Sequence, residues 1–160
     1  TPVVPPLMPD RLLLDSMLGT LATYLRMCGY DAAYVLDGID PADDPGDDAI
    51  VERARASGRT ILTRDRDLAA RADDALLLHS REIKEQLSEL DAAGYDLSLD
   101  AEPARCGSCN GEVSPVDADA PLPAYAPDPA DTDCWRCREC KQVFWKGGHW
   151  DDVRSTLDSV

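Results

Sequence analysis

The sequence of 160 residues has no apolar run close to the roughly 20 residues that a membrane-spanning helix needs. Its first nine residues are rich in proline and contain no charged segment followed by an apolar core, which argues against a secretion signal. The sequence also lacks an internal repeat. We therefore expect a soluble, cytoplasmic protein that has no membrane partner.

Basic residues are scarce, and the formal net charge is −15. Aspartate outnumbers glutamate 24 to 7, and arginine outnumbers lysine 13 to 3, a balance typical of halophilic proteins. At about 1 M salt the Debye length is only about 3 Å, so an acidic surface repels RNA little beyond contact distance. The negative charge therefore indicates a salty habitat and does not exclude a nucleic-acid partner.

Short apolar segments alternate with amphipathic ones along the first hundred residues. Strands are expected over residues 11–15, 32–36, 60–63 and 75–78, and helices over residues 18–28, 49–57, 65–71 and 80–92. Strands joined through helices need crossover connections, which place them parallel in one sheet. The pattern predicts a three-layer α/β domain with a mostly parallel sheet.

Five of the six cysteines fall between Cys106 and Cys140. They include two CxxC pairs, Cys106 with Cys109 and Cys137 with Cys140, whose spacing lets two thiolates share one tetrahedral ion. Because the cytosol keeps thiols reduced, such pairs indicate metal rather than disulfides. We predict a zinc ribbon in which Zn²⁺ holds the fold and takes no part in catalysis.

A third CxxC, Cys134 with Cys137, leaves the composition of the second pair open. The alternating run that follows Cys140 favours Cys137 with Cys140 and makes Cys134 a spare residue. Cys28 lies on an apolar helix face and is expected in the core. The prediction divides the chain into a tail (1–10), an α/β domain (11–100) and a ribbon (101–160). The ribbon contains a proline-rich insertion and a C-terminal helix. The boundary between the two domains lies near residues 101–105.

The segment from Cys134 to Trp150 carries a local charge of +3 and holds all three tryptophans and the only phenylalanine. Interleaved basic and planar side chains suit phosphate contact and base stacking. The alternative is that Phe144 and one or two tryptophans form the small core of the ribbon. The predicted RNA contacts are Arg136, Arg138, Lys141, Trp145, Lys146, His149 and Trp150, with Arg26 and Arg64 from the α/β domain.

Three aspartates are placed to meet at one edge of the predicted sheet. Asp15 ends the first strand, Asp65 follows the third, and Asp47 stands at the start of a helix. The carboxyl ends of parallel strands share an edge, and a carboxylate cluster there suits Mg²⁺ or Mn²⁺, which activates water for attack on a phosphodiester. Each aspartate is also a good helix N-cap, and Asp48 is an alternative to Asp47.

Several of these segments together resemble a known family. Residues 15–31, 47–50, 58–66, 105–111 and 144–150 are similar to the mutator-seven C-terminal ribonuclease family, a PIN-like domain fused to a zinc ribbon. The resemblance spans residues 11–150 and implies a PIN-like fold. It also implies acidic site residues at Asp15, Asp47 and Asp65 and zinc ligands at Cys106, Cys109, Cys137 and Cys140.

We therefore predict a metal-dependent ribonuclease that cuts RNA internally through an Asp-bound divalent cation, with the ribbon docking RNA. The main alternative is a non-catalytic RNA-binding or ribosome-associated adaptor in which the α/β domain only packs. A third reading, a toxin-like nuclease, requires a protein antitoxin as partner.

Overall fold

A parallel sheet forms the centre of the structure, a computed structural model that describes residues 11–37, 41–43, 45–99 and 103–160. The predicted tail (1–10) and part of the predicted boundary at 101–105 lie outside the described residues. The sheet has the strand order β2-β1-β3-β4, with every neighbouring pair parallel. Its strands are β1 (Arg11–Leu14), β2 (Asp31–Tyr34), β3 (Thr60–Thr63) and β4 (Ala75–Leu77).

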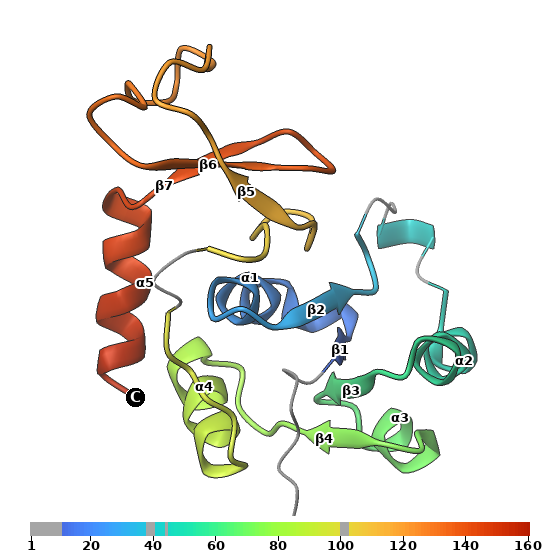
Figure 1. Ribbon diagram of the computed structural model, residues 1–160. Helices are drawn as coiled ribbons and strands as arrows, with labels where there is room; N and C mark the ends of the chain where they lie inside the picture. The colour runs from blue at the N-terminus through green and yellow to red at the C-terminus, as the bar shows by residue number, and fades with distance from the viewer. Residues whose placement is uncertain (1–10, 38–40, 44, 100–102) are drawn as a thin grey trace, which may run out of the picture.

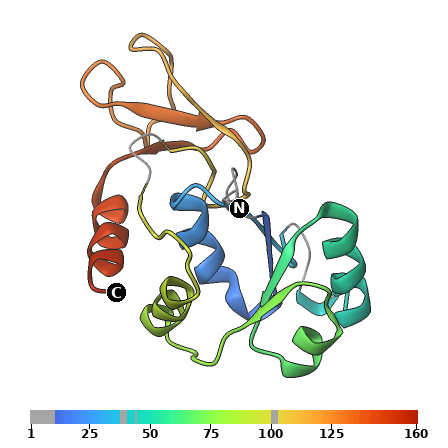
Figure 2. The same ribbon diagram turned by 60° about the horizontal axis from the view of Figure 1, so that its bottom comes forward.

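Helices cover both faces of this sheet, as the crossover argument predicts. Figure 2 shows α1 and α4 on one side of the strands and α2 and α3 on the other. The elements are the 3₁₀ turns η1 (Ser16–Leu18) and η2 (Pro41–Asp43) and the helices α1 (Gly19–Met27), α2 (Asp47–Ser57), α3 (Arg66–Arg71) and α4 (Ile83–Ala92). The predicted α/β class with a parallel sheet is confirmed.

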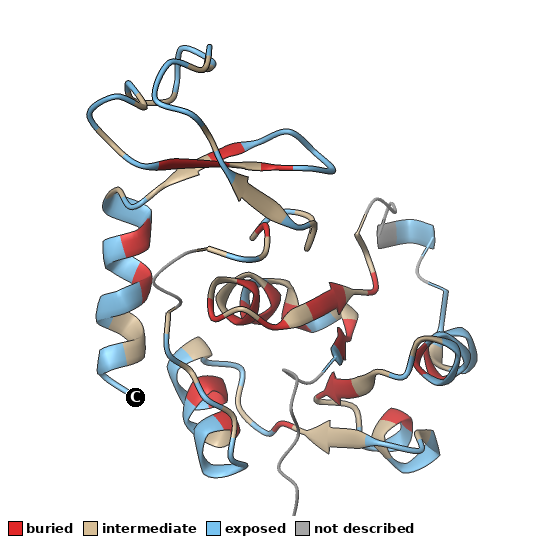
Figure 3. Ribbon diagram, viewed as in Figure 1, coloured by how far each residue is buried: buried red, intermediate tan, exposed pale blue. Residues whose placement is uncertain are grey.

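The apolar residues of β1 divide between two hydrophobic clusters. Leu12 and Leu14 pack in the cluster that includes α1 and α4, whereas Leu13 packs with residues of α2 and α3. All three leucines have 0% exposure, because successive side chains of a strand point to opposite faces and helices cover both (Figure 3). A continuous apolar run is therefore what this strand requires.

Two helix boundaries differ from the sequence prediction. Helix α4 begins at Ile83 with Glu82 as N-cap, so the predicted start at residue 80 is wrong by three residues; the Ser80 hydroxyl accepts a hydrogen bond from the Glu82 N–H at 3.0 Å. Helix α2 begins at Asp47, two residues before the predicted start, because Gly46 (φ +84°) turns the chain into the helix. Cys28 is buried in the core as predicted.

The C-terminal part contains a second, antiparallel sheet and one helix. Strands β5 (Val113–Pro115), β6 (Cys134–Cys137) and β7 (Val143–Trp145) pair in that order, and residues 116–133 between β5 and β6 contain no helix or strand. Helix α5 (Gly148–Asp158) returns from β7 to the α/β domain, where Leu157 packs against the cluster of α1 and α4 (Figure 1). Among the described helices, none has the length and apolar character to cross a bilayer.

Candidate functional site

The four cysteines of the two predicted pairs form a compact cluster. Their sulfur atoms all lie within 4.8 Å of one another, with Cys106 Sγ 3.7 Å from Cys140 Sγ and Cys109 Sγ 3.5 Å from Cys137 Sγ. Tetrahedral zinc with Zn–S bonds of about 2.3 Å separates its sulfurs by about 3.8 Å. The number, chemistry and spacing of the donors therefore fit a Zn²⁺ ion, and the cluster could hold one.

The two cysteine pairs lie in turns of the same geometry, a first knuckle (residues 106–110) and a second knuckle (residues 137–141), and Cys134 lies outside both. The Asn110 N–H donates to the Cys106 carbonyl at 2.8 Å, and the Lys141 N–H donates to the Cys137 carbonyl at 3.1 Å. Both donor residues have φ +68°. Cys134 is buried in β6 and its thiol donates to the Thr132 carbonyl at 3.4 Å, away from the cluster.

The thiols of the cluster differ in their tendency to ionise. Burial raises the pKa of Cys106 above its ordinary value. At Cys137 burial acts in the same direction, but hydrogen bonds from the backbone N–H groups of Cys140 and Glu139 outweigh it and lower the pKa to about 7. Four adjacent thiolates need a cation, so zinc binding and ionisation of this cluster are coupled.

At the carboxyl edge of the parallel sheet, a buried threonine joins two of the predicted acids. Asp15 directly follows β1 and is 5% exposed. Its Oδ2 accepts a hydrogen bond from the Thr63 hydroxyl at 2.7 Å, and that hydroxyl oxygen accepts one from the Asp65 N–H at 2.9 Å. Thr63, which sequence reasoning missed, therefore couples the ends of β1 and β3.

Asp15 and Asp65 also cap the turns that follow their strands. Asp15 Oδ1 accepts from the Ser16 N–H at 2.7 Å, and Asp65 Oδ1 accepts from the N–H groups of Asp67 at 2.9 Å and Leu68 at 3.4 Å. Within the described part of the chain, Asp65 Oδ2 receives no hydrogen bond. Capping thus uses one oxygen of Asp65 and leaves the other available.

Asp47 lies on the first turn of α2, where Gly46 is the N-cap and no side chain caps the helix. Helix capping therefore does not account for an aspartate at position 47. Asp47 and its neighbour Asp48 both pair with Arg71 of α3, the Asp47 carboxylate at 3.8 Å. Across the ranges that the structure describes, the cysteines are the only group of three or more His, Cys, Asp or Glu side chains placed to hold one metal ion, so the three aspartates do not form such a group.

The two arginines predicted to contact RNA from the α/β domain occupy different environments. Arg64 stands between Thr63 and Asp65, and its buried Nε has no partner among the described residues. Arg26 is 3% exposed and donates to the carbonyls of Ala32 at 2.8 Å and Gly107 at 3.1 Å and to Asp37 at 2.6 Å. These contacts hold α1, β2 and the first knuckle together and do not favour direct RNA contact by Arg26.

The first knuckle is also fixed to edge strand β2 through Asn110. Asn110 Oδ1 accepts from the Ala32 N–H at 2.9 Å, and Asn110 Nδ2 donates to Asp31 Oδ1 at 2.7 Å. Asp31 additionally pairs with three arginines. Its burial raises the carboxyl pKa, but hydrogen bonds from Arg59 and Asn110 and the charges of Arg59 and Arg105 outweigh that effect and lower the pKa below 3.8.

The tryptophans of the ribbon divide between core and surface. Trp135 and Trp150 are each 6% exposed, so for these two the structure favours a role in the ribbon core. Trp145 is partly exposed and stacks on Tyr125 with ring centroids 6.3 Å apart. The exposed Lys146 lies with its Nζ 5.3 Å from the centre of the Trp150 ring, a cation–π contact.

The remaining predicted contacts lie on the surface of the ribbon. Lys141 and His149 are exposed. Arg138 is exposed but pairs with Glu112 at 3.5 Å and donates to Ser114 Oγ at 2.7 Å. Arg136 is partly exposed and donates to the Pro121 carbonyl at 3.3 Å.

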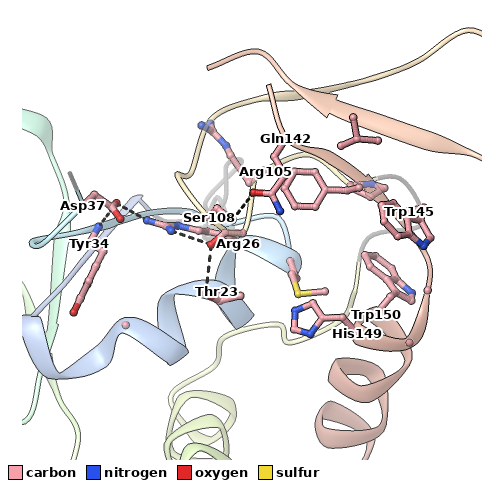
Figure 4. A pocket seen from close by; sticks show the side chains of 18 residues that line it. Thr23, Arg26, Tyr34, Asp37, Arg105, Ser108, Gln142, Trp145, His149 and Trp150 are labelled. Carbon is pink, nitrogen blue, oxygen red and sulfur yellow. Dashed lines mark hydrogen bonds and ion pairs between the residues drawn. The ribbon is translucent and has the colours of Figure 1, made fainter. Parts of the chain in front are cut away.

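A cleft of about 610 Å³ separates α1 from the ribbon. Figure 4 shows Thr23 and Arg26 of α1 facing Trp145, His149 and Trp150 of the C-terminal part across it. The cleft extends past α1 to Tyr34 and Asp37, at and just beyond the end of β2.

The fold and the site together define a two-part protein, in which a parallel α/β domain with acids at one sheet edge carries a four-cysteine ribbon. Residues 10–157 match the Mut7-C RNAse domain. The chain belongs to this family, which indicates a nuclease-like function with RNA as substrate and confirms the resemblance found in the sequence. Comparisons with curated proteins and with solved structures gave no match.

Proposed function

We propose that this protein is a divalent-metal-dependent ribonuclease that cuts RNA internally at the carboxyl edge of its parallel sheet. The observation that carries the proposal is the buried link between Asp15, Thr63 and Asp65. This link joins two acids just beyond the carboxyl ends of adjacent strands β1 and β3, the edge at which α/β folds bind ligands. The proposal also includes a PIN-like fold for the α/β domain. It further includes a cytoplasmic location, where the six free cysteines stay reduced.

The carboxylates have the chemistry that a hard cation requires. Oxygen ligands from Asp15, Asp47 and Asp65 suit Mg²⁺ or Mn²⁺. Such a cation, when bound, lowers the pKa of water and neutralises charge on the phosphodiester. Asp15 is held in place by Thr63, and Asp65 offers its unbonded Oδ2. Asp47 approaches from the start of α2, which follows β2 and so begins at the same edge.

The ribbon serves as a docking platform in this proposal. Zn²⁺ at the four cysteines would hold the two knuckles together. The exposed cations Lys141 and Lys146 and the partly exposed Trp145 then provide contacts to phosphate and to bases. In this proposal Arg64 supplies a further phosphate contact beside the carboxylates. Its buried Nε has no hydrogen-bond partner among the described groups, which supports this role.

Asparagine substitutions separate catalysis from capping. Asn preserves the shape of Asp and still caps a helix, so Asp15→Asn and Asp65→Asn should leave the fold intact. Loss of one anionic ligand weakens cation binding, and we expect Mn²⁺-dependent cleavage of single-stranded RNA to fall by about 100-fold or more. Calorimetry with Mn²⁺ should show a site in the wild type that is lost in Asp65→Asn.

Two neighbouring aspartates provide a matched control for the third acid. The Asp47 side chain is 34% exposed and that of Asp48 is 87% exposed, although both pair with Arg71. Asp47→Asn should reduce cleavage strongly and Asp48→Asn should not. The reverse result would assign the middle acid to Asp48.

A non-catalytic RNA-binding or ribosome-associated adaptor is the second candidate. The arrangement of the three aspartates favours it, because in the described structure they do not form a group placed to hold one metal ion. An adaptor binds RNA without cutting it. Wild-type protein that binds RNA in Mg²⁺ or Mn²⁺ at high salt, yet leaves the RNA intact over hours, would establish this candidate instead.

A further inference from the structure

The cleft between α1 and the ribbon has the size and lining of a ligand site. Its volume of about 610 Å³ lies within the range of about 300–1,000 Å³ usual for small-ligand pockets. Phe144 and Trp145 line one wall and are partly exposed, while His149 is exposed at the start of α5. A planar ligand could stack on these aromatic side chains.

Glycines shape two parts of this cleft. A Cβ atom at Gly147 would lie 2.7 Å from Trp145 Nε1, so the indole packs directly on the glycine backbone. A Cβ at Gly19 would lie 3.3 Å from the ring of Tyr34, at the other end of the cleft. The absence of both side chains lets Trp145 and Tyr34 take their places in the lining.

The charge of the cleft is opposite to that of the whole chain. Among the described residues that line it, Asp37 is the only acid, and its carboxylate is paired with the buried Arg26 at 2.6 Å. Arg105, which lies 3.8 Å from Asp31 outside the lining, adds a second positive charge, whereas the chain has 31 acidic and 16 basic residues. Helix α5 also begins at this cleft without a side-chain cap, and the positive end of its dipole faces the cleft, although Asp151 on the first turn offsets part of that charge. An anionic ligand is favoured here.

The cleft leads to the proposed catalytic edge. Tyr34 lines its far end, and the Tyr34 hydroxyl donates to the Ser16 carbonyl at 2.6 Å. Ser16 follows Asp15 directly, and the Val35 N–H bonds to the Leu14 carbonyl at 3.0 Å. A polymer lying along the cleft would therefore run from the ribbon aromatics towards Asp15.

We infer that this cleft is the binding groove for single-stranded RNA. An unpaired base stacks on the exposed side of Trp145, its phosphate lies at the start of α5, and the strand continues past Tyr34 towards Asp15. This inference rests on the proposed function and names its substrate class. A base within a duplex has no free face for Trp145, so single-stranded RNA is selected over double-stranded RNA.

Two substitutions at Gly148 test the phosphate contact. Gly148 lines the cleft, and a Cβ there would meet no atom within 4 Å, so both Gly148→Asp and Gly148→Asn should fold. A negative charge on the first turn of α5 favours the helix but repels a phosphate. In polarisation titrations of labelled oligouridine with zinc-loaded protein and no Mg²⁺ or Mn²⁺, Gly148→Asp should bind about fivefold more weakly or worse. Gly148→Asn should stay within about twofold of the wild type.

A pair of substitutions at Trp145 tests the stacking. Trp145→Ala should weaken binding of the oligouridine by about tenfold or more, and Trp145→Phe, which keeps an aromatic face, should restore most of it. A hairpin duplex should bind more weakly than the single strand and respond little to either change. Thermal unfolding of each variant checks that the ribbon remains folded.

The outcomes distinguish this inference from the proposed function. Normal binding by both Gly148→Asp and Trp145→Ala in a protein that still cuts RNA would refute the assignment of the cleft as the RNA-binding groove. The ribonuclease proposal would still stand. Equal binding of hairpin and single strand would also refute the groove assignment. Loss of binding in both variants of a protein that never cuts RNA would support the groove and refute the catalytic proposal.

Discussion

Asn110 offers a test of how the ribbon is joined to the parallel sheet. Its side chain makes two hydrogen bonds across the junction, and its backbone has φ +68°. Asn110→Gly removes the side chain and keeps that backbone accessible, whereas Asn110→Ala removes the side chain and adds strain. The two variants therefore separate the hydrogen bonds from the backbone conformation.

The expected loss can be worked out from these contacts. Without Asn110, the N–H of Ala32, a residue with 0% exposure, loses its acceptor, which costs about 1–3 kcal/mol. Loss of the hydrogen bond to Asp31 adds about 1 kcal/mol to this cost. The value lies at the low end of the range for a charged partner because Arg59 also donates to that carboxylate. We expect Asn110→Gly to lower the free energy of unfolding by about 2–4 kcal/mol, and Asn110→Ala by about 1 kcal/mol more.

Urea denaturation at a fixed free zinc concentration measures these values from the midpoint and slope of the transition. Lys141→Gly is the matched control, because Lys141 occupies the same turn position in the second knuckle, with φ +68°, but is exposed. In Lys141→Gly the relief of backbone strain is offset by the greater conformational entropy of glycine in the unfolded chain, so this variant should stay within about 0.5 kcal/mol of the wild type. Equal effects of Asn110→Gly and Lys141→Gly would refute the assigned role of Asn110.

Three further predictions concern the metal, pH and salt. Elemental analysis should find one zinc per chain, which Cys134→Ser retains and Cys137→Ser loses; the opposite pattern would contradict the ligand assignment. The lowered pKa of Asp31 means that its contribution to stability is fully present above the ordinary value of 3.8 and is lost as pH falls through the folded-state pKa. Asp31→Asn should therefore flatten the acid limb of the stability curve measured by urea unfolding. The thermal midpoint should rise between about 0.1 M and 2 M KCl, because salt screens repulsion in a chain of net charge −15, and an unchanged midpoint would exclude this.

Local patterns were sufficient to predict most of the α/β framework. The run Leu12 to Leu14 had to be a strand covered on both faces, and all three residues have 0% exposure. Gly29 and Gly58, at φ +94° and +64°, follow the ends of their helices, in a conformation that glycine adopts without the strain a side chain adds. These features depend on neighbours within a few residues, so the sequence displays them directly.

Contacts between distant segments could not be predicted in the same way. Asn110 bonds to a residue 78 positions away, and Thr63 bonds to Asp15 across 48 positions. Arg26 looked like a surface arginine suited to phosphate because its partners were unknown. A threonine that ends a buried strand two residues before an acid was the only available signal for Thr63.

The attachment of the ribbon has a consequence for self-association. An edge strand normally presents free N–H and C=O groups that can pair with a strand of another molecule. On edge strand β2, Asn110 takes the N–H of Ala32, Arg26 takes the carbonyl of Ala32, and Asp37 accepts from the N–H of Tyr34 at 3.2 Å. The ribbon thus helps to block this edge against strand addition, and a ribbon that lost its fold would expose a template for aggregation.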